Sequence, residues 1–233
     1  MTDLATSLQS VLDGRWAHVR NEIRAADPRR FGPPGEELGR EEYCAYTSAQ
    51  LRELAKEPWA RDGLPESMGG TGEFGASVTA FETLGHGDLS LWVKAGVHFG
   101  LYGGALANLG TERHHTAYLG SLLDVSVPGC FAMTETGHGS DVQHLLTTAT
   151  YDLSTDELVV HTPSVTGRKD YIGNAVRDAR MAAVFAQLVT DAGSHGVHCV
   201  LVPVRDADGT VLPGVTIEDC GPKAGSREST TAG

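Results

Sequence analysis

The sequence predicts an α+β fold, with a helical domain over residues 1–125 followed by a small β domain over residues 126–233. Up to about residue 124, apolar residues recur at steps of three, four and seven, which is the spacing of one helix face. After Pro128, short runs rich in β-branched residues alternate with turn-forming segments, as in strands. Strands and helices do not alternate regularly along the chain, so neither a TIM barrel nor a Rossmann fold is predicted.

Five helices are predicted in the amino-terminal half. The first begins near Leu4 and ends before Asp27-Pro28, because proline disfavours a helical conformation in the residue before it. The others are predicted over Glu41–Glu57, Ala76–Leu84, Leu89–Leu109 and from Thr111 to about Leu123. Asp88 and Thr111 are candidate N-caps for the last two, since their side-chain oxygens can accept from free helix N–H groups.

The segment Leu89–Leu109 carries a single formal charge, Lys94, and approaches the length of a membrane span. It also contains several glycines together with His98 and Asn108. Small residues let helices approach closely inside a folded core. We therefore predict a buried helix here and no membrane span.

Five strands are predicted in the carboxy-terminal half. They cover Cys130–Thr134, Leu146–Tyr151, Glu157–Thr162, Met181–Val189 and Val197–Val204. The segments between them that are rich in Asp, Gly, Ser and Thr are predicted to be turns. These turns are Asp152–Asp156, Asp191–Gly196 and Arg205–Thr210.

Composition excludes several classes of function. The formal net charge is -12 at pH 7, so no broad basic surface and no nucleic-acid partner are expected. The four cysteines lie far apart without a C-x-x-C pair, so no zinc site is predicted. A sparse set of thiols like this one is typical of a reducing compartment, which predicts a cytoplasmic protein. The cysteines are Cys44, Cys130, Cys199 and Cys220.

Histidines gather at three places, and each group is predicted to be structural or exposed rather than a metal site. Neighbours on a helix point to different sides, and neighbours on a strand face opposite ways, so adjacent residues do not converge on one ion. The groups are His114 with His115, His138 with His144, and His195 with His198 and Cys199.

The densest candidate for chemistry is the segment Cys130–Asp141, where a β-rich run ends in a turn with two glycines and three hydroxyl side chains. Glycines permit close backbone approach, and hydroxyls with free N–H groups suit a heteroaromatic ring or a phosphate. On the residues alone, a plain strand-to-turn junction is the competing interpretation. The chain carries no G-x-G-x-x-G at a helix start, no P-loop and no G-x-S-x-G elbow.

The segment Phe131–Val142, F-A-M-T-E-T-G-H-G-S-D-V, followed by Thr147–Asp152, closely resembles the middle domain of acyl-CoA oxidases. The wider acyl-CoA dehydrogenases share a T-E-x-G-x-G-S-D core, and the histidine between the two glycines favours the oxidase branch. The resemblance extends over about residues 40–225. Its further segments are Leu64–Gly72, Phe81–Asp88, Lys169–Ala175, Pro213–Ile217 and Gly221–Lys223.

This resemblance implies a helical amino-terminal domain, a small antiparallel β-barrel-like middle domain and, in full-length relatives, a carboxy-terminal helical domain, with FAD between the last two. It implies that Thr134 hydrogen-bonds the flavin ring and that Gly173 lets the backbone pass close to it. Ser140 is expected to face the acyl-CoA as well as the flavin. The other residues implied at the cofactor are Phe131, Met133, Gly139, Tyr171 and Ile172.

The implied activity is α,β-dehydrogenation of an acyl-CoA to a trans-2-enoyl-CoA in fatty acid β-oxidation, with electrons passed to FAD and then to oxygen. A carboxylate removes the α-proton, and donors at the flavin and thioester edges stabilise developing charge. The expected partners are therefore acyl-CoA and oxygen, and full-length relatives imply a homo-oligomer. Two alternatives stay open: an acyl-CoA dehydrogenase that passes electrons to a flavoprotein, and a non-catalytic remnant that binds flavin or acyl-CoA.

The resemblance also implies that the catalytic base is a glutamate of the carboxy-terminal domain, before which this chain is expected to end. No catalytic residue is therefore assigned, Glu135 belongs to the flavin-side motif, and the chain alone is expected to be inactive. A one-base frameshift near Gly225 can convert Ser226–Ala232, with suitable codons, into Leu-Pro-Gly-Val-Asp-Asn-Gly, similar to the continuation in relatives. Early termination of a dedicated short protein is the alternative.

Overall fold

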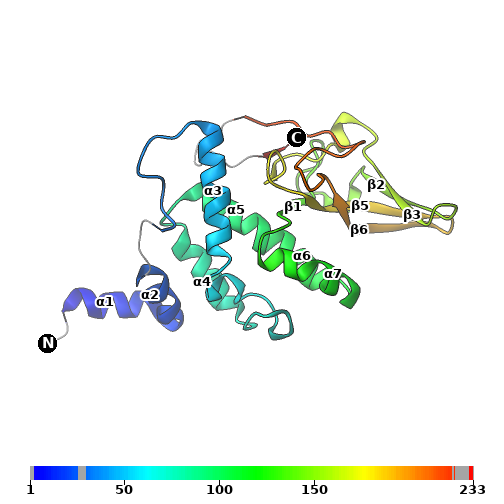
Figure 1. The fold of residues 1–233 in the computed structure, drawn as a ribbon. Helices are drawn as coiled ribbons and strands as arrows, with labels where there is room; N and C mark the ends of the chain where they lie inside the picture. The colour runs from blue at the N-terminus through cyan, green and yellow to red at the C-terminus, as the bar shows by residue number, and fades with distance from the viewer. Residues whose placement is uncertain (1–2, 26–29, 222, 224–230, 233) are drawn as a thin grey trace. The chain divides into compact units, whose positions relative to one another are not determined.

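A computed structural model of the chain describes residues 3–25, 30–221, 223 and 231–232 (Figure 1). The predicted α+β class is confirmed, because helices precede a curled sheet. Contacts divide the chain into two compact units, Met1–Gly96 and Val97–Gly233. The change from helix to strand comes later, between Leu123 and Gly129, because two helices belong to the second unit. The domain boundary near residue 125 stays a prediction.

The first unit is built from helices α1 to α5. The helix predicted to run on from Leu4 is interrupted after Asp13, because Gly14 adopts a left-handed φ of 58° that a helix cannot continue through. Arg24 then holds the carboxylate of Asp13 with two bonds of 2.6 and 2.9 Å, which ties α1 to α2. The helices are α1 (Leu4–Asp13), α2 (Ala17–Ala25), α3 (Arg40–Leu54), α4 (Phe74–Leu84) and α5 (Leu89–Ala95).

The predicted stop at Asp27-Pro28 lies outside the described residues, and α2 ends at Ala25. The predicted cap at Asp88 is confirmed, because its carboxylate accepts from the N–H groups of Ser90 and Leu91 at 2.7 and 3.1 Å. Inside this unit Phe81 of α4 stacks on Trp92 of α5 at 4.6 Å between ring centroids. The aromatic stacking joins α4 to α5, and the buried cap stabilises the start of α5.

The predicted helix Leu89–Leu109 is helical over its whole length, but its middle is not α-helical. A π-helical segment, η4 (Gly96–Tyr102), separates α5 from α6 (Gly103–Leu109), and α7 (Glu112–Leu123) follows. Thr111 begins α7 as predicted, with its N–H donating to His114 Nδ1 at 3.1 Å. Among the described residues, no helix is both long and apolar enough to cross a membrane.

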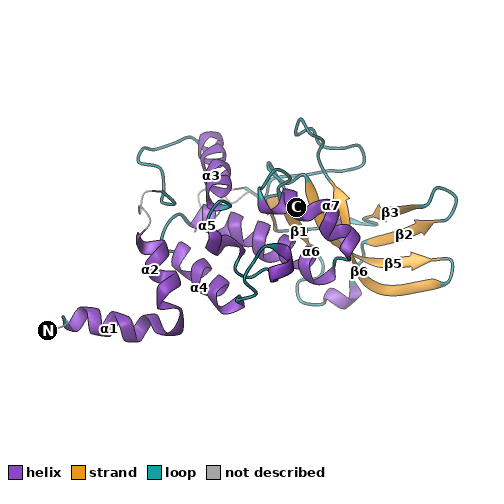
Figure 2. Cartoon of the chain, turned by 60° about the horizontal axis from the view of Figure 1, so that its bottom comes forward, coloured by secondary structure: helices purple, strands orange, loops and turns teal. Residues whose placement is uncertain are grey.

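All five predicted strands are present in one sheet, and two short strands, β4 and β7, form a separate two-stranded sheet. The strand β6 begins at Gly193, inside the segment predicted as a turn, because β5 and β6 form one tight antiparallel hairpin. Figure 2 shows the hairpins β2–β3 and β5–β6 side by side. The strands are β1 (Gly129–Ala132), β2 (Thr148–Asp152), β3 (Glu157–His161), β4 (Ile172–Gly173), β5 (Met181–Thr190), β6 (Gly193–Pro203) and β7 (Thr231–Ala232).

The sheet is mixed: the antiparallel pairing expected for the β domain is present in its two hairpins, and two parallel pairs occur beside it. Hairpins make β2–β3 and β5–β6 antiparallel, whereas β1 and β2 both pair with β5 in parallel. Parallel neighbours need a long connection, and the segments that follow β1 and β2 supply it. The predicted strand positions were right because they depend on local pattern, whereas pairing direction depends on distant segments.

The two strands β1 and β2 share one edge of β5. Residues 129–132 pair with 181–184, and residues 148–150 pair with 187–189. Between these two stretches, Phe185 and Ala186 have no strand neighbour on that edge. The chain between β1 and β2, residues 133–147, leaves the sheet at this gap. The candidate segment Cys130–Asp141 therefore lies where the strand pairing along β5 is interrupted.

Helices α6 and α7 cover one face of this sheet. A buried cluster joins Tyr102, Ala105, Leu106 and Leu122 to Ala183 of β5. The start of β1 lies against this cluster so closely that a Cβ on Gly129 would stand 2.1 Å from the Tyr102 ring. Glycine at position 129 therefore sets how near the sheet approaches the helices.

His98 connects η4 to the end of α7 and to the start of β1. It is fully buried; its Nε2 lies 2.8 Å from the carbonyl oxygen of Leu122, and its Nδ1 lies 3.1 Å from the N–H of Gly129. Because a carbonyl only accepts, Nε2 carries the proton and Nδ1 accepts from Gly129. A buried neutral imidazole thus satisfies one backbone group at the end of α7 and one at the start of β1.

We expect Gly129→Ala to destabilise the protein by about 1–3 kcal/mol, because the added methyl overpacks the Tyr102 contact. Gly120→Ala in α7 is the matched control, since a Cβ there meets nothing within 4 Å and alanine has the higher helix propensity. Urea unfolding followed by circular dichroism measures both. Equal midpoints for the two variants would contradict the close approach at Gly129.

Candidate functional site

The candidate site is built where the segment 133–147 leaves the sheet. Its backbone is held from one side by residues 166–170, which run alongside it in the opposite direction. The N–H of Thr136 donates to Arg168 O at 2.9 Å, and the N–H of Gly137 donates to Thr166 O at 2.8 Å. The N–H of Asp170 donates to Thr134 O at 3.0 Å. Two segments far apart in sequence are thereby joined by main-chain bonds.

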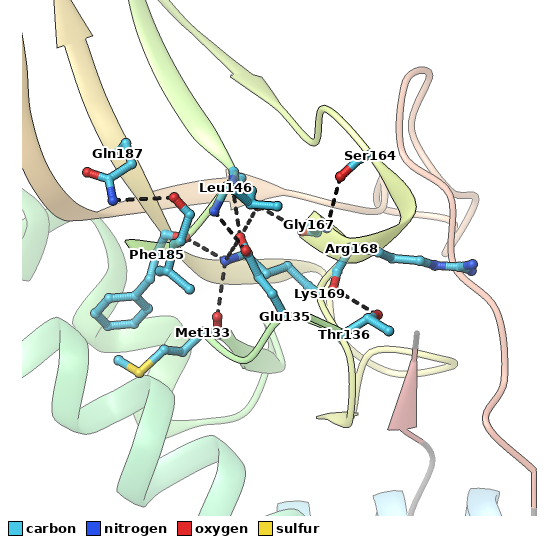
Figure 3. A network of polar contacts seen from close by, with 12 residues as sticks. Met133, Glu135, Thr136, Leu146, Ser164, Gly167, Arg168, Lys169, Phe185 and Gln187 are labelled. Atoms are coloured by element: carbon cyan, nitrogen blue, oxygen red, sulfur yellow. Dashed lines mark hydrogen bonds and ion pairs between the residues drawn. The ribbon is translucent and has the colours of Figure 1, made fainter. Parts of the chain in front are cut away.

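Lys169 fills the gap between β1 and β2. Its ammonium donates to the carbonyl oxygen of Phe185 at 2.7 Å, to that of Met133 at 3.1 Å and to Glu135 Oε1 at 3.0 Å (Figure 3). The Phe185 carbonyl belongs to the stretch of β5 that lacks a strand partner on this edge. A side-chain cation therefore occupies the place of the missing strand and satisfies a backbone group that would otherwise be buried without a partner.

Glu135 is 1% exposed and is the anion of this network. Its Oε2 accepts from the N–H of Leu146 at 2.7 Å. Its Oε1 accepts from the N–H and hydroxyl of Thr147, at 2.9 and 2.7 Å, besides Lys169. The carboxylate thus joins the start of the 133–147 segment to its end, directly before β2 begins.

The network decides the ionisation of both side chains. Burial by itself would raise the pKa of the Glu135 carboxyl, but hydrogen bonds from Leu146, Thr147 and Lys169 outweigh it and hold that pKa below its ordinary value. Burial lowers the pKa of the Lys169 ammonium, and the Glu135 carboxylate opposes this shift. At neutral pH the pair is an ionised, hydrogen-bonded pair, the form in which a buried charge is tolerated.

The predicted site residues on the first segment leave polar groups available for a ligand. Thr134 is half-buried, and among the residues described in the structure its hydroxyl has no hydrogen-bond partner. Gly139 and Ser140 are exposed on the turn that follows, and a Cβ at Gly139 would meet nothing within 4 Å. Met133 is half-buried and its carbonyl is engaged by Lys169.

Tyr171, which directly follows the 166–170 segment, combines an exposed side chain with a strained backbone. It is 72% exposed and adopts a φ of 61°, a conformation that costs a non-glycine residue about 1–3 kcal/mol. Its backbone is held there because its N–H donates to Asp170 Oδ1 at 2.9 Å. A strained backbone that presents an aromatic ring to solvent is typical of a ligand contact rather than of core packing.

Ile172 and Gly173 follow as the short strand β4, and both are buried. A Cβ on Gly173 would lie 2.7 Å from Val97, so glycine is required here for packing within the unit, whatever else approaches it. The strand β7 pairs with β4 in antiparallel fashion. The residues around the predicted frameshift at Gly225 lie outside the described residues.

Phe131 is placed on the helix-covered face of the sheet. Its ring lies 4.8 Å from the ring of Phe185 and packs against the cluster around Tyr102. The ring is half-buried, so part of it belongs to the core. Its role at a flavin stays a prediction.

The histidine groups do not form a metal site within the described parts of the chain, where no cluster of three potential ligands occurs. His144 pairs with Asp141 at 2.7 Å, and His195 lies 2.7 Å from the Thr190 hydroxyl. All four cysteines are free thiols. Burial raises the pKa of Cys130 to about 12, so this thiol is not a nucleophile at neutral pH.

The sequence alone did not reveal the role of Lys169. Both Glu135 and Lys169 lie in the motifs that carry the family resemblance, but they are 34 residues apart, and no local period joins them. Glu135 is the single charged residue of its run, but Lys169 lies between Arg168 and Asp170, so nothing in the local sequence marks it. Pairing the two requires knowing that β1 and β2 share an edge of β5.

We expect Glu135→Gln to destabilise the protein by about 3 kcal/mol at pH 7, because Lys169 is left buried without its anion. A carboxyl whose folded pKa is depressed stabilises the fold above its unfolded pKa, about 4.3, and this contribution is lost as pH falls through the folded pKa. The wild-type protein should therefore lose stability below about pH 4, and the variant should lose less over the same range.

Urea midpoints between pH 7 and pH 3 measure this difference. Glu53→Gln is the control, since Glu53 forms an exposed pair with Lys56 at 2.5 Å and exposed pairs contribute little. Parallel pH profiles for the wild type and Glu135→Gln would refute the ionised buried pair.

Comparison with known proteins gives a consistent result for both halves of the chain. The model of the acyl-CoA dehydrogenase N-terminal domain matches residues 18–126, and that of the acyl-CoA dehydrogenase middle domain matches residues 130–233. Peroxisomal acyl-coenzyme A oxidase 3 of Arabidopsis thaliana is 44% identical over 148 residues, which are 64% of this chain and 22% of that protein.

Solved structures agree. Acyl-CoA oxidase 1 from Yarrowia lipolytica superposes with a TM-score of 0.78 at 25% identity, over 93% of this chain and 30% of that one. Acyl-CoA oxidase-1 from Caenorhabditis elegans, solved with FAD and ATP, superposes with a TM-score of 0.71 at 30% identity, over 94% of this chain and 32% of that one. This chain thus spans less than a third of the length of these relatives, and it belongs to the acyl-CoA dehydrogenase and oxidase superfamily.

Proposed function

We propose that this chain forms the flavin-side part of an FAD-dependent acyl-CoA oxidase. The proposed overall reaction is α,β-dehydrogenation of an acyl-CoA to a trans-2-enoyl-CoA, with acyl-CoA and oxygen as substrates. A homo-oligomeric assembly is proposed from the family resemblance. The cytoplasmic location stays a prediction, and the Arabidopsis relative carries a peroxisomal name.

One observation carries the proposal: the backbone at Thr134 is held by hydrogen bonds, whereas its hydroxyl bonds no described residue. Its carbonyl accepts from Asp170, and Lys169 holds the carbonyl directly before it. Among the described residues nothing binds the hydroxyl, although the residue is half-buried. A hydroxyl on a backbone held this firmly, and engaged by no described residue, can bond a ligand without prior rearrangement. The carbonyl and nitrogen edge of a flavin ring offers the matching acceptor.

The residues present fit FAD in two further respects. Tyr171 offers an exposed aromatic face, and the 138–140 turn is open enough for close approach, with no side chain at Gly139. When bound, FAD would accept hydride from the substrate β-carbon and transfer the electrons to oxygen. In this proposal Thr134 orients the ring by its hydroxyl, Tyr171 covers it, and Ser140 faces the thioester end of the acyl-CoA. Met133, Ile172 and Gly173 supply the backbone that lines the site.

Glu135 is not the base that removes the α-proton. Its two oxygens accept four hydrogen bonds, and the side chain is buried, so it has no route to a substrate. A general base must lie within hydrogen-bond reach of the proton it takes. Glu135 instead keeps the 133–147 segment in shape, and the base is assigned to no residue of this chain.

We expect Thr134→Val to weaken FAD binding about five- to tenfold, because it removes one hydrogen bond at nearly unchanged shape. Quenching of flavin fluorescence during titration with the purified protein that contains this chain measures the dissociation constant. Thr150→Val on β2 is the control, because Thr150 is an exposed threonine outside the site. Equal FAD affinity for wild type and Thr134→Val would sink this assignment of the hydroxyl, and no FAD binding by the wild type would sink the proposed function.

Oxidase and dehydrogenase alternatives differ in the electron acceptor. We expect the protein that contains this chain, given FAD and a saturated acyl-CoA in air, to release hydrogen peroxide in step with enoyl-CoA formation. Reduction of an artificial acceptor without peroxide would favour the dehydrogenase. FAD binding with neither product would favour the non-catalytic binding module.

A further inference from the structure

We propose that Lys169 is a positioning residue that holds the two flavin-side segments, Met133–Thr134 and Tyr171–Gly173, in one fixed arrangement. The proposal rests on the proposed function for the identity of the ligand. It concerns a residue that touches neither substrate nor cofactor and acts through the backbone of those that do.

The Lys169 ammonium has no donor left for a ligand. An ammonium carries three N–H donors, and here they go to Met133 O, Glu135 Oε1 and Phe185 O. Its side chain is 13% exposed. A cation that is saturated and mostly buried does not bind an anionic ligand, so its charge serves the fold around the site. Figure 3 shows the three acceptors converging on it from two segments of the chain, Met133 and Glu135 from one and Phe185 of β5 from the other.

Lys169 lies two residues before Tyr171, and the residue between them restrains the Tyr171 backbone. The next residue, Asp170, donates its N–H to Thr134 O and accepts the N–H of Tyr171 on its carboxylate. The strained φ of 61° at Tyr171 follows immediately. Strain of this kind persists where surrounding bonds over-determine the backbone. The Lys169 ammonium and the Asp170 bonds together form that constraint.

Two roles of Lys169 can be separated by mutation. One is to balance the charge of Glu135; the other is to bridge the carbonyls of Met133 and Phe185. Lys169→Met removes both roles and leaves Glu135 as a buried unpaired anion. The double variant Glu135→Gln, Lys169→Met removes the unpaired charge, because two neutral side chains of similar length replace the pair, but it leaves the two carbonyls without their donor.

The experiment measures hydrogen–deuterium exchange and FAD affinity in parallel on the purified protein that contains this chain. We expect Lys169→Met to accelerate exchange at least about tenfold in peptides covering 131–140 and 170–175, without change in peptides covering α3. The double variant should regain thermal stability relative to Lys169→Met, yet keep the fast exchange. Both should bind FAD at least about tenfold more weakly than the wild type.

The matched control is the pair Glu53→Gln and Lys56→Met, which makes the same substitutions in an exposed ion pair of α3 and the turn after it. This control should change neither hydrogen–deuterium exchange in the 131–140 and 170–175 peptides nor FAD affinity. Wild-type exchange in the double variant would overturn the proposal and reduce Lys169 to a counter-ion. If the wild-type protein that contains this chain binds no FAD, the proposed function fails, while the exchange data still decide whether Lys169 holds the two segments together.

Discussion

The site depends on one constraint, which is that two strands share a single edge of β5. Where β1 ends and β2 has not yet begun, the carbonyl of Phe185 faces no strand. Lys169 donates to it at 2.7 Å. A buried ammonium needs an anion, and Glu135 supplies one. At this interruption of the strand pairing the missing donor is supplied by a buried ion pair, and the pair in turn holds the segment that leaves the sheet there.

The polar groups of this region fall into two sets with different tasks. Glu135, Lys169 and Asp170 are saturated by hydrogen bonds within the unit and keep two segments in place. The side-chain hydroxyls of Thr134, Ser140 and Tyr171 form no hydrogen bond with any described residue. In a binding site, hydrogen-bonded supporting residues of the first kind hold the ligand-facing groups of the second kind in place. Groups that are already ordered lose less conformational entropy when a ligand binds.

The same principle explains the tight packing beneath the site. Gly129 lets Tyr102 approach β1, and Gly173 lets Val97 approach β4. His98 joins Gly129 to Leu122 from the π-helical segment. Each contact brings a helix against a strand that adjoins a candidate ligand-binding segment. Glycines in these motifs thus serve close packing inside the unit, in addition to any close approach of a cofactor.

The sequence by itself determined the α+β class, the five main strands, the cap at Asp88 and the family, because each rests on local pattern or on motifs read in order. It did not reveal the break at Gly14, the π-helical segment or the parallel pairing with β5, which depend on packing between distant segments. The candidate residues Thr134 and Tyr171 were named from their motif. That Glu135 and Lys169 meet at 3.0 Å was decided by the tertiary structure alone, since 34 residues and an interrupted sheet edge lie between them.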